Sequence, residues 1–175
     1  EEAAQHLAHW PADNVIFQPA NRNTAPGILL PLAHISHRDP FATVAVFPSD
    51  HLILQEEQFM ASVQQAVTET QRFPRWLTLL GMTPDRAEEG YGWIEPGAAE
   101  AWRATQPVRR FWEKPAPLDA HALFRRGALW NTFVFVAQAN TVWEMTRQAV
   151  PNLYRDFMSM RRALSHSRAA WVTES

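Results

Sequence analysis

TVAVFPSDH, residues 43–51, is the segment of the sequence that most constrains the fold. Its first residues form a short apolar run, which is typical of a strand buried on both faces of a parallel sheet. Pro48 ends the strand because proline has no N–H to donate to the ladder. Asp50 then follows at the carboxyl end of the strand, where open α/β sheets bind their ligands. A loop aspartate is usually a solvated turn residue, but its position at the end of a buried strand favours a role in ligand binding.

Short apolar strands alternate with amphipathic helices along the rest of the chain. This alternation predicts an α/β fold with a mixed, mostly parallel sheet and helices on both faces. The chain shows no internal repeat and no linker, so we expect a single domain over residues 1–175. The expected strands are 14–18, 43–47, 76–80, 91–95, 108–112 and 129–137, and the expected helices are 1–10, 24–37, 59–70, 119–126, 141–150 and one from 151 onward.

The composition excludes several classes of protein. A formal charge of −2 and a pI near 6.4 argue against a nucleic-acid-binding surface, which is normally basic. The sequence has no apolar run long enough for a membrane span and no signal peptide at its start. The absence of cysteine rules out disulfides and thiolate metal sites, and agrees with a cytoplasmic location.

Lys114 is the single lysine among 16 Lys and Arg residues. Lysine presents a compact charge on a flexible stem, which suits one phosphate oxygen. Glu113 precedes it and Pro115 follows it, so the backbone is stiff. Strand alternation also predicts that the two side chains face opposite ways. Such a pair is ordinarily a solvated surface feature, but a rigid carboxylate and ammonium also match the hydroxyls and phosphate of a sugar phosphate.

Three further features allow both a structural and a functional interpretation. Gly92 lies inside an expected strand, which often marks the close approach of a ligand or of another backbone. Asn131 begins an apolar strand, where its amide either caps a turn or contacts a hydroxyl. The loop at 18–24 precedes a helix, which we expect Thr24 to cap, and a helix N-terminus favours polar or anionic ligands.

Five segments occur in the order and spacing seen in the sugar-nucleotide pyrophosphorylases, and the chain resembles that family from about residue 14 to 151. Within the family, the resemblance is greatest to members that transfer a guanylyl group to mannose 1-phosphate. The segments are QPANRNTAP (18–26), VFPSDHLI (46–53), LLGMTPDRAEEGYGWIEPG (79–97), RRFWEKPAP (109–117) and ALWNTFVF (128–135).

The resemblance implies a Rossmann-like nucleotidyltransferase domain that uses GTP, mannose 1-phosphate and Mg²⁺. It implies that Asp50 binds the metal and Lys114 the sugar phosphate, which makes these two the catalytic residues. It further implies that the backbone at Gly92 touches the sugar and that Glu113 and Asn131 bind sugar hydroxyls. The residues implied to border the nucleotide are Gln18, Asn23 and Thr24.

The chain also departs from the family pattern. The resemblance implies a glycine-rich loop with Arg and Lys before this segment and a second metal-binding Asp after it, and the 175 residues contain neither. Where the family has Trp-Asn-Ser-Gly, this chain has Trp130, Asn131, Thr132 and Phe133. We therefore expect the sugar-phosphate-binding middle of a catalytic domain. The alternative is a non-catalytic module that binds sugar phosphate or nucleotide or serves oligomerisation. A homodimer that covers the sheet edge is expected in either case.

Overall fold

The computed structural model describes residues 7, 9–11 and 14–173, and side chains as far as residue 162. Contacts divide the chain into two compact units, Glu1–Ala42 with Trp143–Ser175 (unit 1) and Thr43–Val142 (unit 2). Within the described residues, every helix is too short or too polar to cross a membrane. The prediction of one domain stays a prediction.

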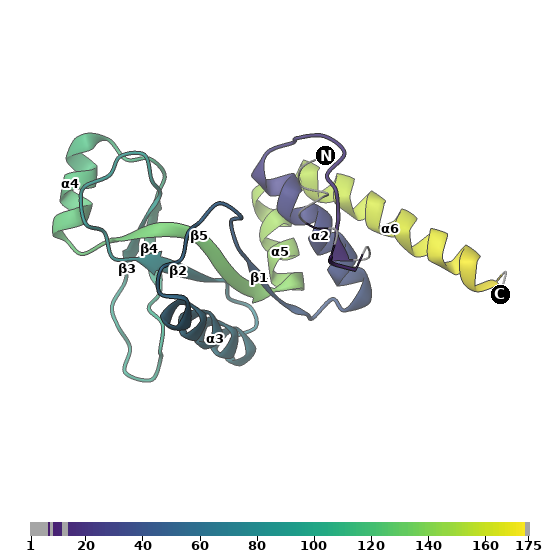
Figure 1. Ribbon diagram of the computed structural model, residues 1–175, viewed down its shortest axis with the longest axis horizontal. Coiled ribbons are helices and arrows are strands. Elements are labelled where there is room, and N and C mark those ends of the chain that lie inside the picture. The colour runs from purple at the N-terminus through teal and green to yellow at the C-terminus, as the bar shows by residue number, and fades with distance from the viewer. Residues whose placement is uncertain (1–6, 8, 12–13, 174–175) are drawn as a thin grey trace. The chain divides into compact units, whose positions relative to one another are not determined.

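Unit 2 is a five-stranded sheet built on one long strand, β5 (Leu129–Gln138). Three strands pair with it, and all three run antiparallel to it: β1 (Thr43–Val46), β2 (Thr78–Met82) and β3 (Trp93–Pro96). A fourth, β4 (Val108–Trp112), pairs antiparallel with β3. Figure 1 shows β5 as the strand that joins the others into one sheet.

The prediction of a mostly parallel sheet is wrong, because each described strand pair is antiparallel. β1 and β2 do run in the same direction, and α3 (Glu56–Arg72) connects them as in a βαβ unit. However, Val136 of β5 pairs with both strands, so β5 lies between them in the reverse direction. Ala45 of β1 is exposed, so this strand is not buried on both faces. An apolar run predicts a strand but not its direction.

The core cluster of unit 2 contains three tryptophans that face one another across the sheet. Trp93 pairs in register with Trp112 of β4 and with Trp130 of β5. The helix α4 (Pro117–Arg125) adds Leu123, which is fully buried in this cluster. Directly opposed residues of neighbouring strands point to the same face of a sheet. The tryptophan row therefore fixes which residues lie on the other face.

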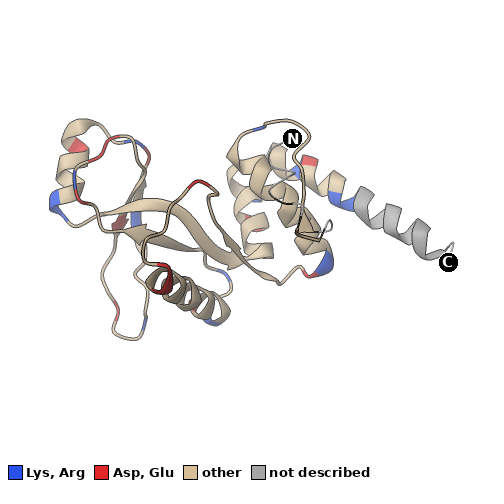
Figure 2. Ribbon diagram, in the orientation of Figure 1, with Lys and Arg blue, Asp and Glu red and all other residues tan. Residues whose placement is uncertain are grey.

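The long β3–β4 connection is held against α3 by a cationic and aromatic cluster. The Arg103 guanidinium lies 3.8 Å from the centre of the Trp76 ring and 3.3 Å from Glu100. Arg72, in the last turn of α3, donates to the carbonyl of Trp102 at 3.2 Å. Figure 2 shows the acidic start and basic end of α3, the arrangement that complements a helix dipole.

Unit 1 contains α2 (Thr24–Arg38) and α6 (Pro151–Thr173), and α5 (Ala139–Ala149) enters it at Trp143. The Trp143 indole N–H donates to Ser36 at 2.8 Å, and Ser36 donates to the Leu32 carbonyl. Residues 14–18 form no strand, contrary to prediction, since a strand needs a ladder partner for its backbone groups. Most of the helix predicted at 1–10 lies outside the described residues.

Leu123→Ala should lower the free energy of unfolding by about 2–5 kcal/mol, because it opens a cavity in a fully buried cluster. Leu118→Ala is the matched control: Leu118 is on the same helix but 85% exposed, so its change should stay within about 0.5 kcal/mol. Urea denaturation of the two variants measures the difference. Equal losses would contradict the placement of α4.

Candidate functional site

Three of the predicted sugar-binding residues face one another across the sheet. Trp93 pairs with Trp112 and Trp130, so one position further along the same register Gly92 lies opposite both Glu113 and Asn131. A hydrogen bond confirms this extension, because the Asn131 N–H donates to the Gly92 carbonyl at 2.8 Å. Residues opposed in this way share a face. Since the tryptophans occupy the core face, this row lies on the other one.

The space above Gly92 is bounded by its two neighbours in the row. A Cβ placed on Gly92 would lie 3.3 Å from Glu113 Oε2, 3.4 Å from the Asn131 Cβ and 2.9 Å from Phe111 Cζ. The missing side chain thus makes room for the end of the Phe111 ring, with the Glu113 carboxylate and the Asn131 side chain beside it. The carboxylate and the amide can both form hydrogen bonds with a polyhydroxylated ligand.

Sequence analysis missed a fourth member of this row. Gly81 pairs directly with Asn131 from β2. Its Cβ would lie 2.7 Å from Leu129 Cδ1 and 2.9 Å from Leu129 Cβ, so the position has no room for a side chain. The predicted strand ended at residue 80, which put Gly81 in a loop. The available signal was a glycine within an apolar run, the same signal that identified Gly92.

A wide bulge follows Asn131 in β5. Leu79 pairs with Phe135 and Gly81 pairs with Asn131, so the single β2 residue between them, Leu80, lies opposite the three β5 residues 132–134. The Phe133 N–H donates to Asn131 Oδ1 at 3.2 Å, so the amide oxygen caps a turn, one of the two roles expected for it. Thr132 Oγ donates to the Leu80 carbonyl at 2.6 Å and accepts from the Val134 N–H at 3.2 Å. These side chains fix the bulge beside the row.

Lys114 and Phe133 both adopt the left-handed backbone conformation, with φ of 43° and 62°. This conformation costs a residue with a side chain about 1–2 kcal/mol relative to glycine. Residues held in it cluster at functional sites. β4 ends at Trp112, so the alternation expected to turn Glu113 and Lys114 to opposite faces does not extend to Lys114.

Asp50 lies in an exposed turn after β1. β2 pairs with Val136 and Trp130 along one edge of β5. β1 also pairs with Val136, and β3 also pairs with Trp130, so these two strands lie along the other edge of β5. The end of β1 lies opposite Phe135 and Trp93 lies opposite Trp130, five residue steps apart along β5, which is at most about 17 Å. The chain that leads to Asp50 thus leaves the sheet near the row.

The described residues contain no group of three His, Cys, Asp or Glu side chains placed to hold a metal ion. Mg²⁺ commonly binds through one or two protein carboxylates, with water and substrate phosphates as its other ligands. Asp50 fits as one such ligand.

A polar loop between β2 and β3 covers the core side of Trp130. The Arg86 guanidinium lies 5.3 Å from the Trp130 ring centre, and the Trp93 indole donates to the Glu88 carbonyl at 2.8 Å. The Gly90 amide and the Arg86 guanidinium hold the pKa of the Glu88 carboxyl below its ordinary value. Hydrogen bonding to Glu88 and the charge of Asp85 raise the pKa of Arg86. The loop is thus an ion-paired cover for the core.

The predicted nucleotide-binding residues belong to unit 1. Asn23, not Thr24, is the N-cap of α2; it has φ of 67° and makes no side-chain capping bond. The Asn23 N–H instead donates to Asn21 Oδ1 at 3.0 Å. Gln18 Oε1 lies 3.6 Å from where a Cβ of Gly27, in the second turn of the helix, would be. Gln18 therefore lies against the start of α2.

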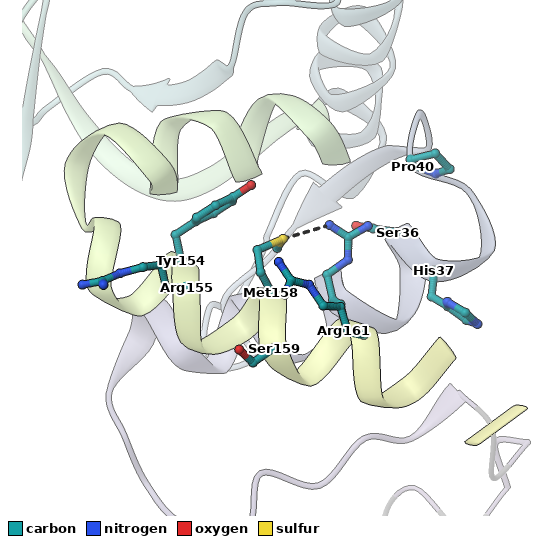
Figure 3. Close-up of a pocket in the computed structure, with 9 residues that line it drawn as sticks. Ser36, His37, Pro40, Tyr154, Arg155, Met158, Ser159 and Arg161 are labelled. Carbon is teal, nitrogen blue, oxygen red and sulfur yellow. Dashed lines mark hydrogen bonds between the residues drawn. The ribbon is translucent and has the colours of Figure 1, made fainter. Parts of the chain in front are cut away.

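A cavity of about 730 Å³ in unit 1 contains none of the predicted residues. It lies between the end of α2 and α6, as Figure 3 shows. Arg161 in its wall contacts Met158 Sδ at 3.6 Å and lies 5.3 Å from the centre of the Trp143 ring, so it packs within the unit. The full lining is Ser36, His37, Pro40, Tyr154, Arg155, Met158, Ser159, Arg161 and Arg162.

Comparison with known proteins identifies the family. The model of the family described as nucleotidyl transferase matches residues 1–163. The chain belongs to this family. The nucleotidyl transferase fold accounts for the α/β organisation of the structure.

Relatives of this nucleotidyl transferase chain include enzymes named mannose-1-phosphate guanylyltransferase. The one from Escherichia coli K12 is 33% identical over 149 residues, covering 81% of this chain and 30% of that protein. The one from Salmonella typhimurium is 34% identical over 149 residues, with the same coverage. A solved structure from Thermus thermophilus, described as mannose-1-phosphate geranyltransferase, superposes with a TM-score of 0.82 at 25% identity. It covers 92% of this chain and 46% of that one. The chain spans about a third of the length of the two enzymes.

Gly81→Ala should destabilise the protein by about 1–3 kcal/mol, because the new methyl group meets the Leu129 Cβ as well as its side-chain end. Gly92→Ala should be tolerated better, since the ends of the Phe111 and Glu113 side chains can move aside. Thermal and urea unfolding of both variants measure the contrast. A Gly81→Ala variant as stable as Gly92→Ala would contradict the register at Asn131.

Proposed function

We propose that this chain forms the sugar-phosphate-binding part of an enzyme that makes GDP-mannose and pyrophosphate from GTP and mannose 1-phosphate. The observation that carries the proposal is the row in which Gly92 lies opposite Glu113 and Asn131 in a chain of the nucleotidyl transferase family. Relatives named mannose-1-phosphate guanylyltransferase at 33–34% identity support this choice of nucleotide and sugar.

Glu113 and Asn131 would bind the hydroxyls of the hexose. A carboxylate only accepts hydrogen bonds, so Glu113 would accept one from a sugar hydroxyl. The Asn131 amide oxygen already accepts the Phe133 N–H, which leaves the amide NH₂ to donate to a sugar oxygen. Gly92 between them has no side chain of its own, so the sugar would approach its backbone beside the Phe111 ring. Together these groups orient the sugar.

Lys114 would bind the phosphate of mannose 1-phosphate. It follows Glu113 directly and is exposed, so its ammonium is accessible to an anion. An ammonium suits a single phosphate oxygen, whereas an arginine would bind two in a fixed plane. Asp50 would be one ligand of a Mg²⁺ ion, which when bound neutralises phosphate charge. The other ligands would come from the nucleotide and water.

The reaction itself needs little covalent participation by the protein. An oxygen of the sugar phosphate attacks the α-phosphorus of GTP, the new P–O bond forms, and the bond to the β-phosphate breaks so that pyrophosphate leaves. Such transfers are accelerated mainly by positioning and by neutralising charge. Glu113, Asn131 and Lys114 would position the attacking phosphate. Gln18, Asn23 and Thr24 stay proposed nucleotide contacts, and the dimer and the cytoplasmic location stay predictions.

A second candidate is a binding module without turnover. The row of Gly92, Glu113 and Asn131 suits it equally, because binding without turnover needs only groups that contact the sugar phosphate. Such a module would bind mannose 1-phosphate through the same row.

Full-length protein incubated with GTP, mannose 1-phosphate and Mg²⁺ tests the proposal. We expect GDP-mannose and pyrophosphate in equal amounts by chromatography. Saturable binding of mannose 1-phosphate without product would support the binding module instead. Neither binding nor product would contradict both functions.

Lys114→Ala should weaken mannose 1-phosphate binding by roughly 1.5–3 kcal/mol, the range for a hydrogen bond to a charged group. Lys114→Arg should recover part of the loss because it keeps the charge. Arg125→Ala, which removes an exposed cation at the end of α4, is the control and should bind normally. Calorimetric titration measures all three, and an unchanged dissociation constant for Lys114→Ala would remove this lysine from the site.

A further inference from the structure

The row that forms the candidate site has an apolar row beside it on the same face of the sheet. Ile94 pairs in register with Phe111 of β4 and with Leu129 of β5, and it lies two residues after Gly92, so these side chains share the face of the site. Ile94 is buried and Leu129 is half-buried, whereas Phe111 is 43% exposed. Phe111 is therefore the residue of this apolar row that a ligand can reach most easily.

The Phe111 ring extends from the apolar row to the candidate site. Its Cζ lies 2.9 Å from the point that a Cβ of Gly92 would occupy, and Glu113 Oε2 lies 3.3 Å from the same point. The Asn131 Cβ lies 3.4 Å from it. Aromatic side chains reach diagonal neighbours across a strand pair in this way. The tip of the ring, the carboxylate and the Asn131 side chain therefore surround one point above Gly92.

A ring in this position can have a structural role, a functional role or both. A diagonal aromatic side chain can stabilise a sheet by covering a strand glycine, and this accounts for the tip of the ring at Gly92. The rest of the ring stays accessible beside a carboxylate and an amide. Ligand sites commonly combine aromatic side chains with a few polar groups that fix the orientation of the ligand. Phe111 supplies the aromatic part of such a site.

We propose that Phe111 is a further substrate-contacting residue, whose exposed ring packs against an apolar C–H face of the hexose that Glu113 and Asn131 bind. The inference rests on the proposed function, since it names the same ligand. A pyranose presents C–H groups on its faces and hydroxyls around its rim. The carboxylate and the amide bind the rim, and the aromatic ring removes one C–H face from water. A hexose with a hydroxyl that interrupts this face loses the contact, so Phe111 contributes to the choice of sugar.

Calorimetric titration of the full-length protein with mannose 1-phosphate, and separately with GTP, tests the proposal on four variants. Phe111→Leu keeps an apolar side chain beside Gly92 but has no flat ring, and Phe111→Ala removes both. These two variants should bind mannose 1-phosphate about threefold to tenfold more weakly, with GTP binding unchanged. Phe124→Ala, which removes a 37% exposed phenylalanine from α4, should change neither. Leu123→Ala, which destabilises the sheet from its core face, should also bind both ligands normally.

Thermal unfolding of the same variants separates a contact with the sugar from a role in stability. We expect mannose 1-phosphate binding to depend on the Phe111 ring and not on the melting temperature. Equally weakened binding in Leu123→Ala would overturn the proposal in favour of a structural role. Normal binding in Phe111→Leu, with Lys114→Ala still weakened, would overturn this inference alone and leave the proposed function standing. If the unaltered protein binds no mannose 1-phosphate, the proposed function fails and this inference fails with it.

Discussion

The antiparallel pairing of β5 is the constraint on which unit 2 depends. This strand has partners on both edges, and its register with β3 sets the register of β4 in turn. Because side chains alternate along each strand, the register of a strand pair determines which residues lie on each of the two faces of the sheet. Trp93, Trp112 and Trp130 meet on the core face, and one position along, Gly92, Glu113 and Asn131 meet on the other. A slip of one residue would destroy the core and the site together.

Two residues beside this row have less favourable backbone conformations than the residues of the core. Lys114 and Phe133 both have the positive φ that glycine adopts most easily. These conformations persist because the surrounding structure is stable. The tryptophans pack in the core, and Asn131 and Thr132 form hydrogen bonds around the bulge. Strained residues concentrated next to a candidate site are expected where ligand contacts, rather than stability, govern residue choice.

Sequence patterns predicted the strands and helices better than their assembly. Periodicity located α3, β4 and α6, and the glycine in YGWIE pointed to a close approach at Gly92, where Glu113 and Asn131 now lie. Periodicity could not predict that β5 runs against its partners, because a buried apolar run is compatible with either direction. It also missed Gly81, which only the pairing with Asn131 makes significant. The role of Asp50 in metal binding and of Gln18, Asn23 and Thr24 in nucleotide binding depends on ligands and stays predicted.

A crystal structure of the full-length protein with mannose 1-phosphate would show whether the row of Gly92, Glu113 and Asn131 binds the sugar. We expect the hexose over Gly92, with hydroxyls within hydrogen-bonding distance of the Glu113 carboxylate and the Asn131 amide nitrogen, and with the phosphate at Lys114. A sugar phosphate bound on another face of the sheet, or bound without contact to Glu113 and Asn131, would contradict it.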